Sequence, residues 1–278
     1  ENTIKKGSQI LKINSVSSHQ LDAQIILSDI MGVTKEFLII NNNIKISQKV
    51  ALKYYKAIKR RVNREPIAYI LGKKEFWSKD FIVNDATLVP RPETELLIYY
   101  LVDYYKNKRI NILDIGTGSG CILLSLLKEL NSSTGIGIDI SPKAINIAKI
   151  NSKRLNLSLR SKFKICNINK SLNGKYDLIV SNPPYIPLKD IKNLSRDILN
   201  YEPLIALNGG IDGLDLIKKV VYKSKSLLKQ NGLLAIEIGI TQERQISKIL
   251  MENGLTITKT QRDFSNIERC ILATVAHS

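Results

Sequence analysis

The sequence is poor in the residues on which many catalytic chemistries depend. Its 278 residues include two histidines, three cysteines and one tryptophan. So few histidines argue against a histidine-based triad or acid–base site, and with only three scattered cysteines the sequence predicts no metal site. Three cysteines with no close pair predict reduced thiols and a cytoplasmic location rather than a disulfide scaffold.

Long apolar runs are also missing. We find no hydrophobic stretch long enough to cross a bilayer, and the first residues lack the apolar core of a signal peptide, so we expect no membrane association. The hydrophobic share of 44% and the charged share of 24% are those of a globular protein. The length allows a large core and a smaller second domain.

Basic residues outnumber acidic ones and give a formal net charge of +17. One interpretation is a nucleic-acid or ribonucleoprotein partner, and the other is the Lys-, Ile- and Asn-rich bias of AT-rich coding, which we favour as the main cause. A smaller contribution comes from one stripe on a predicted helix. This stripe is either a solvated face, which we favour, or a surface for an acidic or RNA-bearing partner. It consists of Lys49, Lys53, Lys56, Arg60 and Arg64.

The first 85 or so residues are expected to form a separate, mostly helical unit. One helix is predicted from about Leu21 to Gly32, and a second from a cap at Ser47 to about residue 64. A short helix follows between Pro66 and Gly72. Strands at 75–77 and 80–83, turning at Ser78-Lys79, then predict a hairpin that links this unit to the rest of the chain.

From residue 110 onward, apolar strand patterns alternate with helical ones. Such alternation predicts a parallel sheet that is covered by helices on both of its faces. The two last strands predict an antiparallel edge. The strands are predicted at 110–115, 136–139, 163–166, 176–181, 233–238, 255–259 and 270–275, and the helices at 96–105, 121–130, 141–150, 212–228 and 242–251.

A glycine-rich loop follows the first of these strands. The segment from Asp114 to Gly120 reads Asp-Ile-Gly-Thr-Gly-Ser-Gly, between a strand and a helix, as a nucleotide-binding loop requires. Asp139 ends the next strand, about 20 positions further on, where a carboxylate can bind ribose hydroxyls. Dinucleotide enzymes share this pattern, and glycines that serve packing alone are a further alternative. The alternating glycines and Asp114 favour a ligand with an ammonium group over a pyrophosphate, and S-adenosylmethionine fits both features.

A second motif, Asn182-Pro183-Pro184-Tyr185, follows the apolar run 178–180. The two prolines end the strand because they lack N–H donors, so the motif lies at the carboxyl edge of the sheet. The carbonyls of Asn182 and Pro183 can hold the NH2 group of a planar amide or exocyclic amine, on which Tyr185 can stack. No base is needed, because the alkylated nitrogen is acidic. The alternative is a proline turn with Asn182 as a local cap.

With these two motifs, the chain resembles class I S-adenosylmethionine-dependent methyltransferases. Asn-Pro-Pro-Tyr is shared by the branch that methylates adenine N6 or glutamine N5. Four further stretches make the chain similar to the bacterial peptide chain release factor N5-glutamine methyltransferase family over most of its length. They are 64–72 with Glu75-Phe76, 90–95, 202–207 with 209–214, and 237–239 with Gln242.

This resemblance implies an α/β fold, in which a Rossmann-like seven-stranded class I methyltransferase domain is joined by a β-hairpin to a small N-terminal helical domain. It implies an N-terminal substrate-binding domain at 1–72, a hairpin linker at 73–87 and an S-adenosylmethionine-binding catalytic domain at 88–278. The implied activity is methyl transfer from S-adenosylmethionine to the glutamine of the Gly-Gly-Gln motif of class I release factors. The implied enzyme is a monomer that requires no nucleic acid.

The resemblance also implies the residues of the site. Asn182, Pro183, Pro184 and Tyr185 are the catalytic residues and, with Arg91, the substrate-binding residues. Where the family has Asp followed by an aromatic residue against the adenine, this sequence has Asn167 and Ile168, so we expect the adenine contacts to differ. The implied cofactor-binding residues are Asp114, Gly116, Thr117, Gly118, Ser119, Gly120, Asp139, Asn167, Ile168 and Asn182.

Two other functions stay open at this point. An adenine-N6 nucleic-acid methyltransferase would use the same Asn-Pro-Pro-Tyr chemistry and a basic surface, but it should also carry a module large enough to flip a base. A non-enzymatic module would only bind a nucleoside or a partner, and would lack a pocket that joins Asn182 to Gly118.

Overall fold

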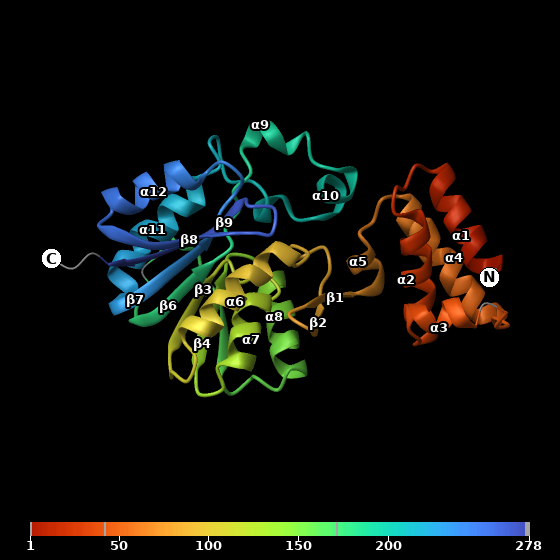
Figure 1. Cartoon of the computed structure of the whole chain (residues 1–278), viewed down its shortest axis with the longest axis horizontal. Coiled ribbons are helices and arrows are strands. Elements are labelled where there is room, and N and C mark those ends of the chain that lie inside the picture. The colour runs from red at the N-terminus through yellow and green to blue at the C-terminus, as the bar shows by residue number, and fades with distance from the viewer. Residues whose placement is uncertain (1, 42, 171, 276–278) are drawn as a thin grey trace. The chain divides into compact units, whose positions relative to one another are not determined.

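In the computed structural model, which describes residues 2–41, 43–170 and 172–275, seven strands pair into one sheet in the order β5-β4-β3-β6-β7-β9-β8 (Figure 1). Strands β3 to β7 run parallel, and β9 is antiparallel to both β7 and β8. This confirms the predicted fold class. The strands are β3 (Asn111–Ile115), β4 (Thr134–Asp139), β5 (Ser161–Ile165), β6 (Tyr176–Ser181), β7 (Leu228–Glu237), β8 (Leu255–Arg262) and β9 (Glu268–Val275).

Helices cover both faces of this sheet. On one face α6 (Glu95–Tyr104), α7 (Cys121–Glu129) and α8 (Pro142–Arg154) enclose one buried core, and on the other α11 (Asp215–Leu227) and α12 (Glu243–Glu252) enclose a second. Val180 and Ile179, adjacent in β6, belong to the first and the second core respectively. Because successive side chains of a strand point to opposite faces, this apolar run is buried on both sides and β6 is fixed in the centre of the sheet.

The chain forms two compact units. Unit 1 comprises residues 1–73 together with 195–201, and unit 2 comprises residues 74–194 and 202–278. Residues 1, 42, 171 and 276–278, which fall within the predicted domains, lie outside the described part of the chain. The helices of unit 1 are α1 (Asn2–Ile13), α2 (His19–Met31), α3 (Lys35–Ile40), α4 (Gln48–Val62), α5 (Ile67–Leu71) and α10 (Arg196–Tyr201).

The helix ends of unit 1 follow the signals in the sequence. The Ser47 hydroxyl accepts the Val50 N–H at 3.3 Å and so caps α4. Gly32 and Gly72 end α2 and α5 in the left-handed conformation, with φ of 67° and 72°. The predicted start of α4 and the predicted ends of α2 and α5 are therefore confirmed, whereas α1, α3 and α10 were not predicted.

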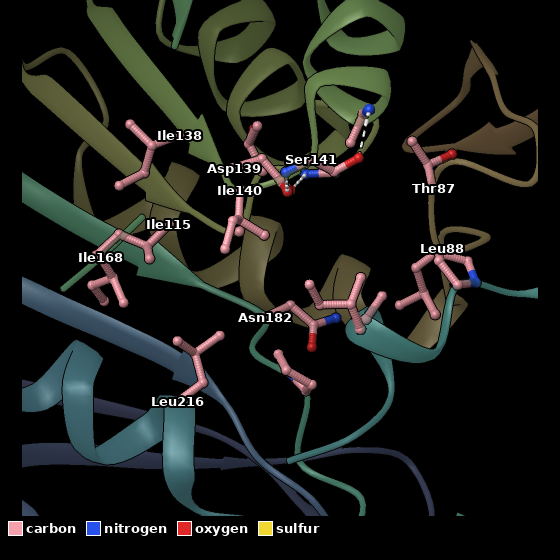
Figure 2. A pocket seen from close by; sticks show the side chains of 18 of the residues that line it. Thr87, Leu88, Ile115, Ile138, Asp139, Ile140, Ser141, Ile168, Asn182 and Leu216 are labelled. Atoms are coloured by element: carbon pink, nitrogen blue, oxygen red, sulfur yellow. Dashed lines mark hydrogen bonds between the residues drawn. The ribbon is translucent and has the colours of Figure 1, made fainter. Parts of the chain in front are cut away.

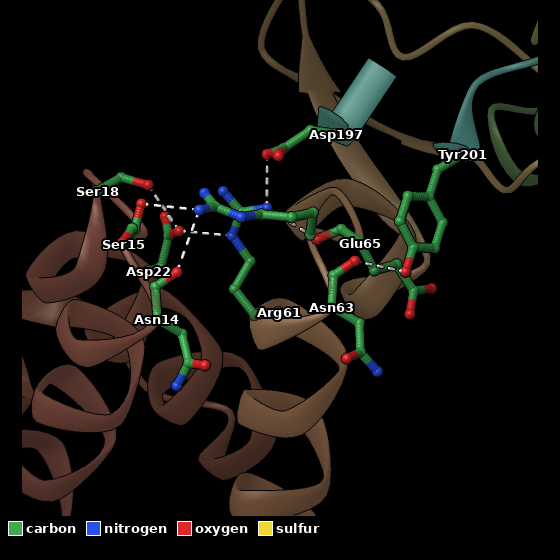
Figure 3. A network of polar contacts seen from close by, with 10 residues as sticks. Asn14, Ser15, Ser18, Asp22, Arg61, Asn63, Glu65, Asp197 and Tyr201 are labelled. Atoms are coloured by element: carbon green, nitrogen blue, oxygen red, sulfur yellow. Dashed lines mark hydrogen bonds and ion pairs between the residues drawn. The ribbon is translucent and has the colours of Figure 1, made fainter. Parts of the chain in front are cut away.

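A buried ion-pair network holds α10 on the other helices of unit 1 (Figure 3). Arg61 of α4 donates from Nε to Asp22 Oδ2 of α2 at 2.7 Å, and from Nη1 to Asp197 Oδ2 of α10 at 2.6 Å. The Tyr201 hydroxyl donates to the Asn63 carbonyl at 2.8 Å. These contacts join a segment that is distant in the sequence to the N-terminal helices.

The basic stripe does not present five equivalent cations. Lys49, Lys53 and Lys56 are exposed, but Arg60 is half-buried and forms an ion pair with Glu65. Arg60 also donates to two backbone carbonyls of α5. The Arg60 guanidinium therefore stabilises the turn between α4 and α5, in addition to any contribution to the surface charge.

The hairpin consists of β1 (Lys73–Phe76) and β2 (Lys79–Ile82). The predicted hairpin is confirmed, but its predicted turn at Ser78-Lys79 was wrong by one residue. The turn residues are Trp77 and Ser78, with φ of 51° and 55°, since two-residue hairpin turns favour positive φ. The Trp77 indole and backbone N–H groups donate to Glu129 and Glu95 at 2.9 and 3.0 Å, and these bonds compensate for a pair of turn residues that lacks Gly and Asn.

Candidate active site

The two sequence motifs meet at one edge of the sheet. β3 and β6 are parallel neighbours in which Ile115 pairs with Ser181, and the Ser181 hydroxyl donates to the Ile115 carbonyl at 2.7 Å. The glycine loop follows Ile115, and Asn182 follows Ser181. Both motifs therefore extend from the carboxyl ends of adjacent central strands, where ligands bind in open α/β sheets.

A cavity of about 410 Å³ opens at this edge (Figure 2). This volume is within the range of small-molecule sites, roughly 300–1,000 Å³. Its lining includes ten of the residues predicted for the site, namely Arg91, Gly116, Thr117, Gly118, Ser119, Asp139, Asn167, Ile168, Asn182 and Pro184. Four other predicted residues, Asp114, Gly120, Pro183 and Tyr185, are not part of the lining.

The glycines of the loop serve two different purposes. Gly118 has a φ of 54°, which favours glycine, and it borders the cavity. Gly120 has a φ of 80°, and a Cβ there would lie 3.1 to 3.3 Å from the side chains of Leu124, Ala148 and Phe163. Glycine is therefore required at position 120 because side chains pack closely under the loop at the start of α7, and at position 118 because the backbone has a positive φ next to the cavity.

Asp139 is half-buried at the end of β4 and borders the cavity. Its Oδ2 accepts the Gly118 N–H and its Oδ1 accepts the Ser141 N–H, both at 2.9 Å. The carboxylate thereby ties the glycine loop to the start of α8. Each oxygen can accept a further hydrogen bond, so Asp139 can also bind hydroxyl groups of a ligand.

Asp114 is completely buried under the loop. Its Oδ2 accepts the Thr117 hydroxyl at 2.6 Å, whereas Oδ1 has no hydrogen-bond partner among the residues that the structure describes. Burial, with a smaller effect of the Asp139 charge, raises the pKa of Asp114 to about 7, although the bond from Thr117 lowers it. This carboxyl group lies just outside the cavity wall and beneath the loop.

Apolar side chains form much of the remaining wall. Ile138, Ile140, Ile168 and Leu216 line the cavity together with Asp139 and Asn182 (Figure 2). An apolar wall with a few polar groups is typical of sites that bind a flat aromatic group and fix its orientation. Asn167 and Ile168 both contribute to this lining.

Asn182 is the first member of a chain of hydrogen bonds that leads into the core. Its Nδ2 donates to Thr94 Oγ1 at 3.2 Å, and the Thr94 hydroxyl donates to Glu237 Oε2 at 2.6 Å. Thr94 and Glu237 are each 2% exposed, and burial raises the pKa of Glu237 to about 7. The amide nitrogen of Asn182 is thus engaged with the protein, so its Oδ1 is the end that can serve a ligand.

Gln242 fixes the backbone of the Asn-Pro-Pro-Tyr turn. Its Nε2 donates to the Tyr185 carbonyl at 3.0 Å, and its Oε1 accepts the Gly239 N–H at 2.9 Å. Pro183 is buried, and burial raises the pKa of the Tyr185 hydroxyl to about 12. Tyr185 is therefore a neutral phenol at physiological pH.

Arg91 is held at the cavity by a carboxylate. Its Nη2 pairs with Glu202 Oε1 at 2.6 Å, while Glu202 Oε2 accepts the Val89 N–H at 3.1 Å. Glu202 is 6% exposed. The Arg91 guanidinium is therefore anchored by a buried partner and keeps donors for a ligand.

Sequence reasoning missed two residues that support the loops. Asn151 of α8 accepts the Ile82 N–H at 2.7 Å and donates to the carbonyls of Ile82 and Ser119 at 3.0 and 2.9 Å. Thr94 was seen only as one member of the 90–95 stretch. An isolated Asn in a helix and a single Thr have no spacing that could have indicated these roles.

Comparison with known proteins adds the family context. A family model described as a methyltransferase domain matches residues 106–270, and one described as the PrmC N-terminal domain matches residues 2–72. The chain is 38% identical over 272 residues to a release factor glutamine methyltransferase of Clostridium acetobutylicum, covering 96% of this chain and 95% of that protein. It is 36% identical over 270 residues to a protein of the same name from Rhodospirillum rubrum, covering 97% and 83%.

Among solved structures, a methyltransferase from Pyrococcus furiosus is similar with a TM-score of 0.56 at 16% identity, covering 79% of this chain and 98% of that one. At this identity the likeness concerns the fold alone. As for the membrane, no helix in the described part of the chain is long and apolar enough to cross one.

Proposed function

We propose that this chain, which belongs to the release factor glutamine methyltransferase family, transfers a methyl group from S-adenosylmethionine to a protein glutamine. The acceptor is the side-chain nitrogen of the glutamine in the Gly-Gly-Gln motif of class I peptide chain release factors. The observation that supports this most directly is the cavity lined by both the glycine loop and Asn182.

The residues of the cavity fit S-adenosylmethionine. Asp139 retains hydrogen-bonding capacity for the ribose hydroxyls, and Ile138 and Ile168 offer an apolar surface for the adenine. The buried Asp114 has an unpartnered oxygen beneath the loop, and its ionised form would favour a ligand with ammonium and sulfonium groups. When bound, S-adenosylmethionine would supply an electrophilic methyl group, so the protein needs only to position the acceptor.

The Asn-Pro-Pro-Tyr turn would hold the acceptor. Asn182 Oδ1 and the Pro183 carbonyl would accept the two N–H groups of the substrate amide and orient its nitrogen toward the methyl group in line. Tyr185, held by Gln242, would pack against the flat amide. A base is unnecessary because the methylated nitrogen is acidic, which agrees with a neutral Tyr185. We further propose that residues 1–72 bind the release factor, with 73–87 as linker, and that the enzyme acts as a monomer without nucleic acid.

The test is methyl transfer from labelled S-adenosylmethionine to a purified release factor, read by mass spectrometry. The methyl group should appear on the glutamine of the Gly-Gly-Gln motif, and a release factor with Gln→Ala at that position should stay unlabelled. Transfer to DNA or RNA, with an unlabelled release factor, would overturn the proposal in favour of an adenine-N6 enzyme.

Two variants separate the roles of the residues. Asn182→Ala should keep cofactor affinity within a modest factor and lose most turnover, because the amide is no longer oriented. Asp139→Ala should instead weaken cofactor binding, as measured by calorimetry. Near-normal turnover of the first, or unchanged affinity of the second, would remove that residue from the proposed site.

A further inference from the structure

A buried chain of hydrogen bonds lies behind the substrate side of the cavity. Asn182 follows β6, Thr94 ends the 3-10 helix η1 (Pro92–Thr94), and Glu237 ends β7. The bonds run from Asn182 Nδ2 to Thr94 Oγ1 at 3.2 Å and from Thr94 Oγ1 to Glu237 Oε2 at 2.6 Å. Both Thr94 and Glu237 are 2% exposed, so water cannot readily replace either partner.

The chemistry of the three groups gives this chain of bonds a direction. An ionised carboxylate only accepts, so the single hydroxyl proton of Thr94 is committed to Glu237. Thr94 Oγ1 can then only accept, and of the two ends of the Asn182 amide only the NH2 group can donate to it. A rotated amide would place Oδ1 against the lone pairs of Thr94 and lose a buried hydrogen bond, so the observed orientation is favoured by roughly tenfold or more.

We propose that Glu237, mainly through Thr94, is a positioning residue that fixes the direction of the Asn182 amide and thereby selects a substrate group that carries N–H donors. This inference rests on the proposed function. With Nδ2 held by Thr94, Oδ1 is the end of the amide that is left for the substrate, and in the proposed function the Pro183 carbonyl would be the second acceptor. An NH2 group satisfies both, whereas a carboxylate is repelled by both.

The bonds have this direction in the ionised form of Glu237, so the measurements below are made at a pH above its pKa. Burial raises its pKa, while the side-chain hydrogen bonds from Thr94 and Asn182 both lower it. A buried carboxyl group is a poor way to fill space in the core, because an apolar residue of similar volume is often as stable or more stable. Its presence next to the site is explained if the acceptor itself is required.

The experiment compares the binding of two release factors that differ in one side chain, one with Gln and one with Glu in the Gly-Gly-Gln motif. Binding is measured by calorimetry in the presence of S-adenosylhomocysteine, so no methyl transfer is needed. The wild-type enzyme should favour Gln over Glu by roughly 100-fold or more, because the wrong group leaves buried polar atoms unpaired.

Three variants then test the direction of the chain of bonds. Glu237→Gln keeps the shape but can donate as well as accept, and Thr94→Val keeps the shape but removes the hydroxyl. Each should lower the preference for Gln over Glu by roughly tenfold. Thr94→Ser, which keeps the hydroxyl, is the matched control and should preserve the preference within about twofold.

The outcomes separate this inference from the proposed function. A wild-type enzyme that binds neither release factor would contradict the proposed function. A wild-type enzyme that discriminates, with Glu237→Gln and Thr94→Val that discriminate equally well, would overturn the inference alone. Reduced discrimination in either variant, with the preference retained in Thr94→Ser, supports it.

Discussion

Replacement of Arg61 by Met should cost unit 1 a large part of its stability. The Arg61 side chain is 8% exposed, and it joins Asp22, which is 6% exposed, to Asp197, which is 29% exposed. Methionine keeps a long apolar side chain and removes the guanidinium. Asp22 would then keep the Ser18 hydroxyl as a donor at 2.7 Å but would lose its counter-charge.

The size of the effect follows from burial. Removal of one partner of a buried ion pair costs about 3–5 kcal/mol, because the other charge stays buried without compensation. The more exposed Asp197 can be rehydrated, so most of the cost comes from Asp22. We expect a loss of about 3 kcal/mol in unit 1, of which the double variant Arg61→Met/Asp22→Asn should recover a part, because the buried charge is then gone.

Hydrogen exchange read by mass spectrometry can follow the two units separately. The amides of α2 and α4 should lose protection in Arg61→Met, while those of β6 and β7 in unit 2 keep theirs. Lys53→Met, an exposed position on α4, is the control and should change the stability by less than about 0.5 kcal/mol. A loss below about 1 kcal/mol in α2 and α4 would show that this network does not hold unit 1 together.

Three further predictions concern unit 2. The pKa of Glu237 is raised from 4.5 to about 7 in the folded protein. Between pH 4.5 and pH 7 the native state therefore binds more protons than the unfolded state, and the free energy of unfolding should fall by about 3 kcal/mol as the pH rises across this range. Urea unfolding across this pH range measures it, and the fall should be smaller in Glu237→Gln. Asn151→Ala leaves backbone groups of Ile82 and Ser119 unpaired. We therefore expect a loss of about 3 kcal/mol in stability, measured by thermal melting, and weaker cofactor binding, measured by calorimetry. An unchanged melting temperature would contradict this. Gly137→Ala would bring a Cβ to 2.7 Å from the Phe163 ring and Thr117 Oγ1, and should cost about 2–3 kcal/mol. Gly116→Ala has open space around its Cβ among the described residues and should cost about 1 kcal/mol from its positive φ, so equal melting temperatures would refute the difference.

The sheet of unit 2 could be predicted because its strands carry their own signals. β6 contains the apolar run 178–180 and is followed by a pair of prolines, and β3 is mainly apolar and is followed by a glycine, so both their existence and their ends were visible. β7 begins at Leu228, five positions before the predicted start, because its polar segment 229–231 has no strand pattern. Leu228 pairs with Tyr176 and Leu233 with Leu178, so this segment lies in an irregularity of the register, which local sequence does not encode.

Helix α10 could not be predicted for a different reason. It is six residues long, none of its residues is buried, and helices this short are not stable on propensity alone. Its place is set by Asp197 and Tyr201, whose partners Arg61 and Asn63 lie more than 100 positions earlier in the chain. A contact at such a separation leaves no periodicity in the sequence.

The site, like the fold, has parts that the local sequence shows and parts that it does not show. The glycine loop, Asp139 and Asn182 could be identified from their positions at the ends of strands, but the hydrogen bonds that support the loops could not, because each joins two different elements. Three of the supporting groups are carboxylates, and each accepts from a different loop. Asp139 holds the Gly118 N–H, Glu202 holds Arg91 and the backbone before it, and Glu237 holds Thr94.

None of these three carboxylates needs to act as a base. A carboxylate that accepts hydrogen bonds from the protein fixes the position of the donor, and it is less available to take a proton from a substrate. In a chain with a net charge of +17, acidic groups at the site thus serve to orient backbone and side-chain donors around the cavity. Such an arrangement suits a methyl transfer in which the cofactor supplies the electrophile, because the rate then depends on how accurately the acceptor nitrogen is oriented.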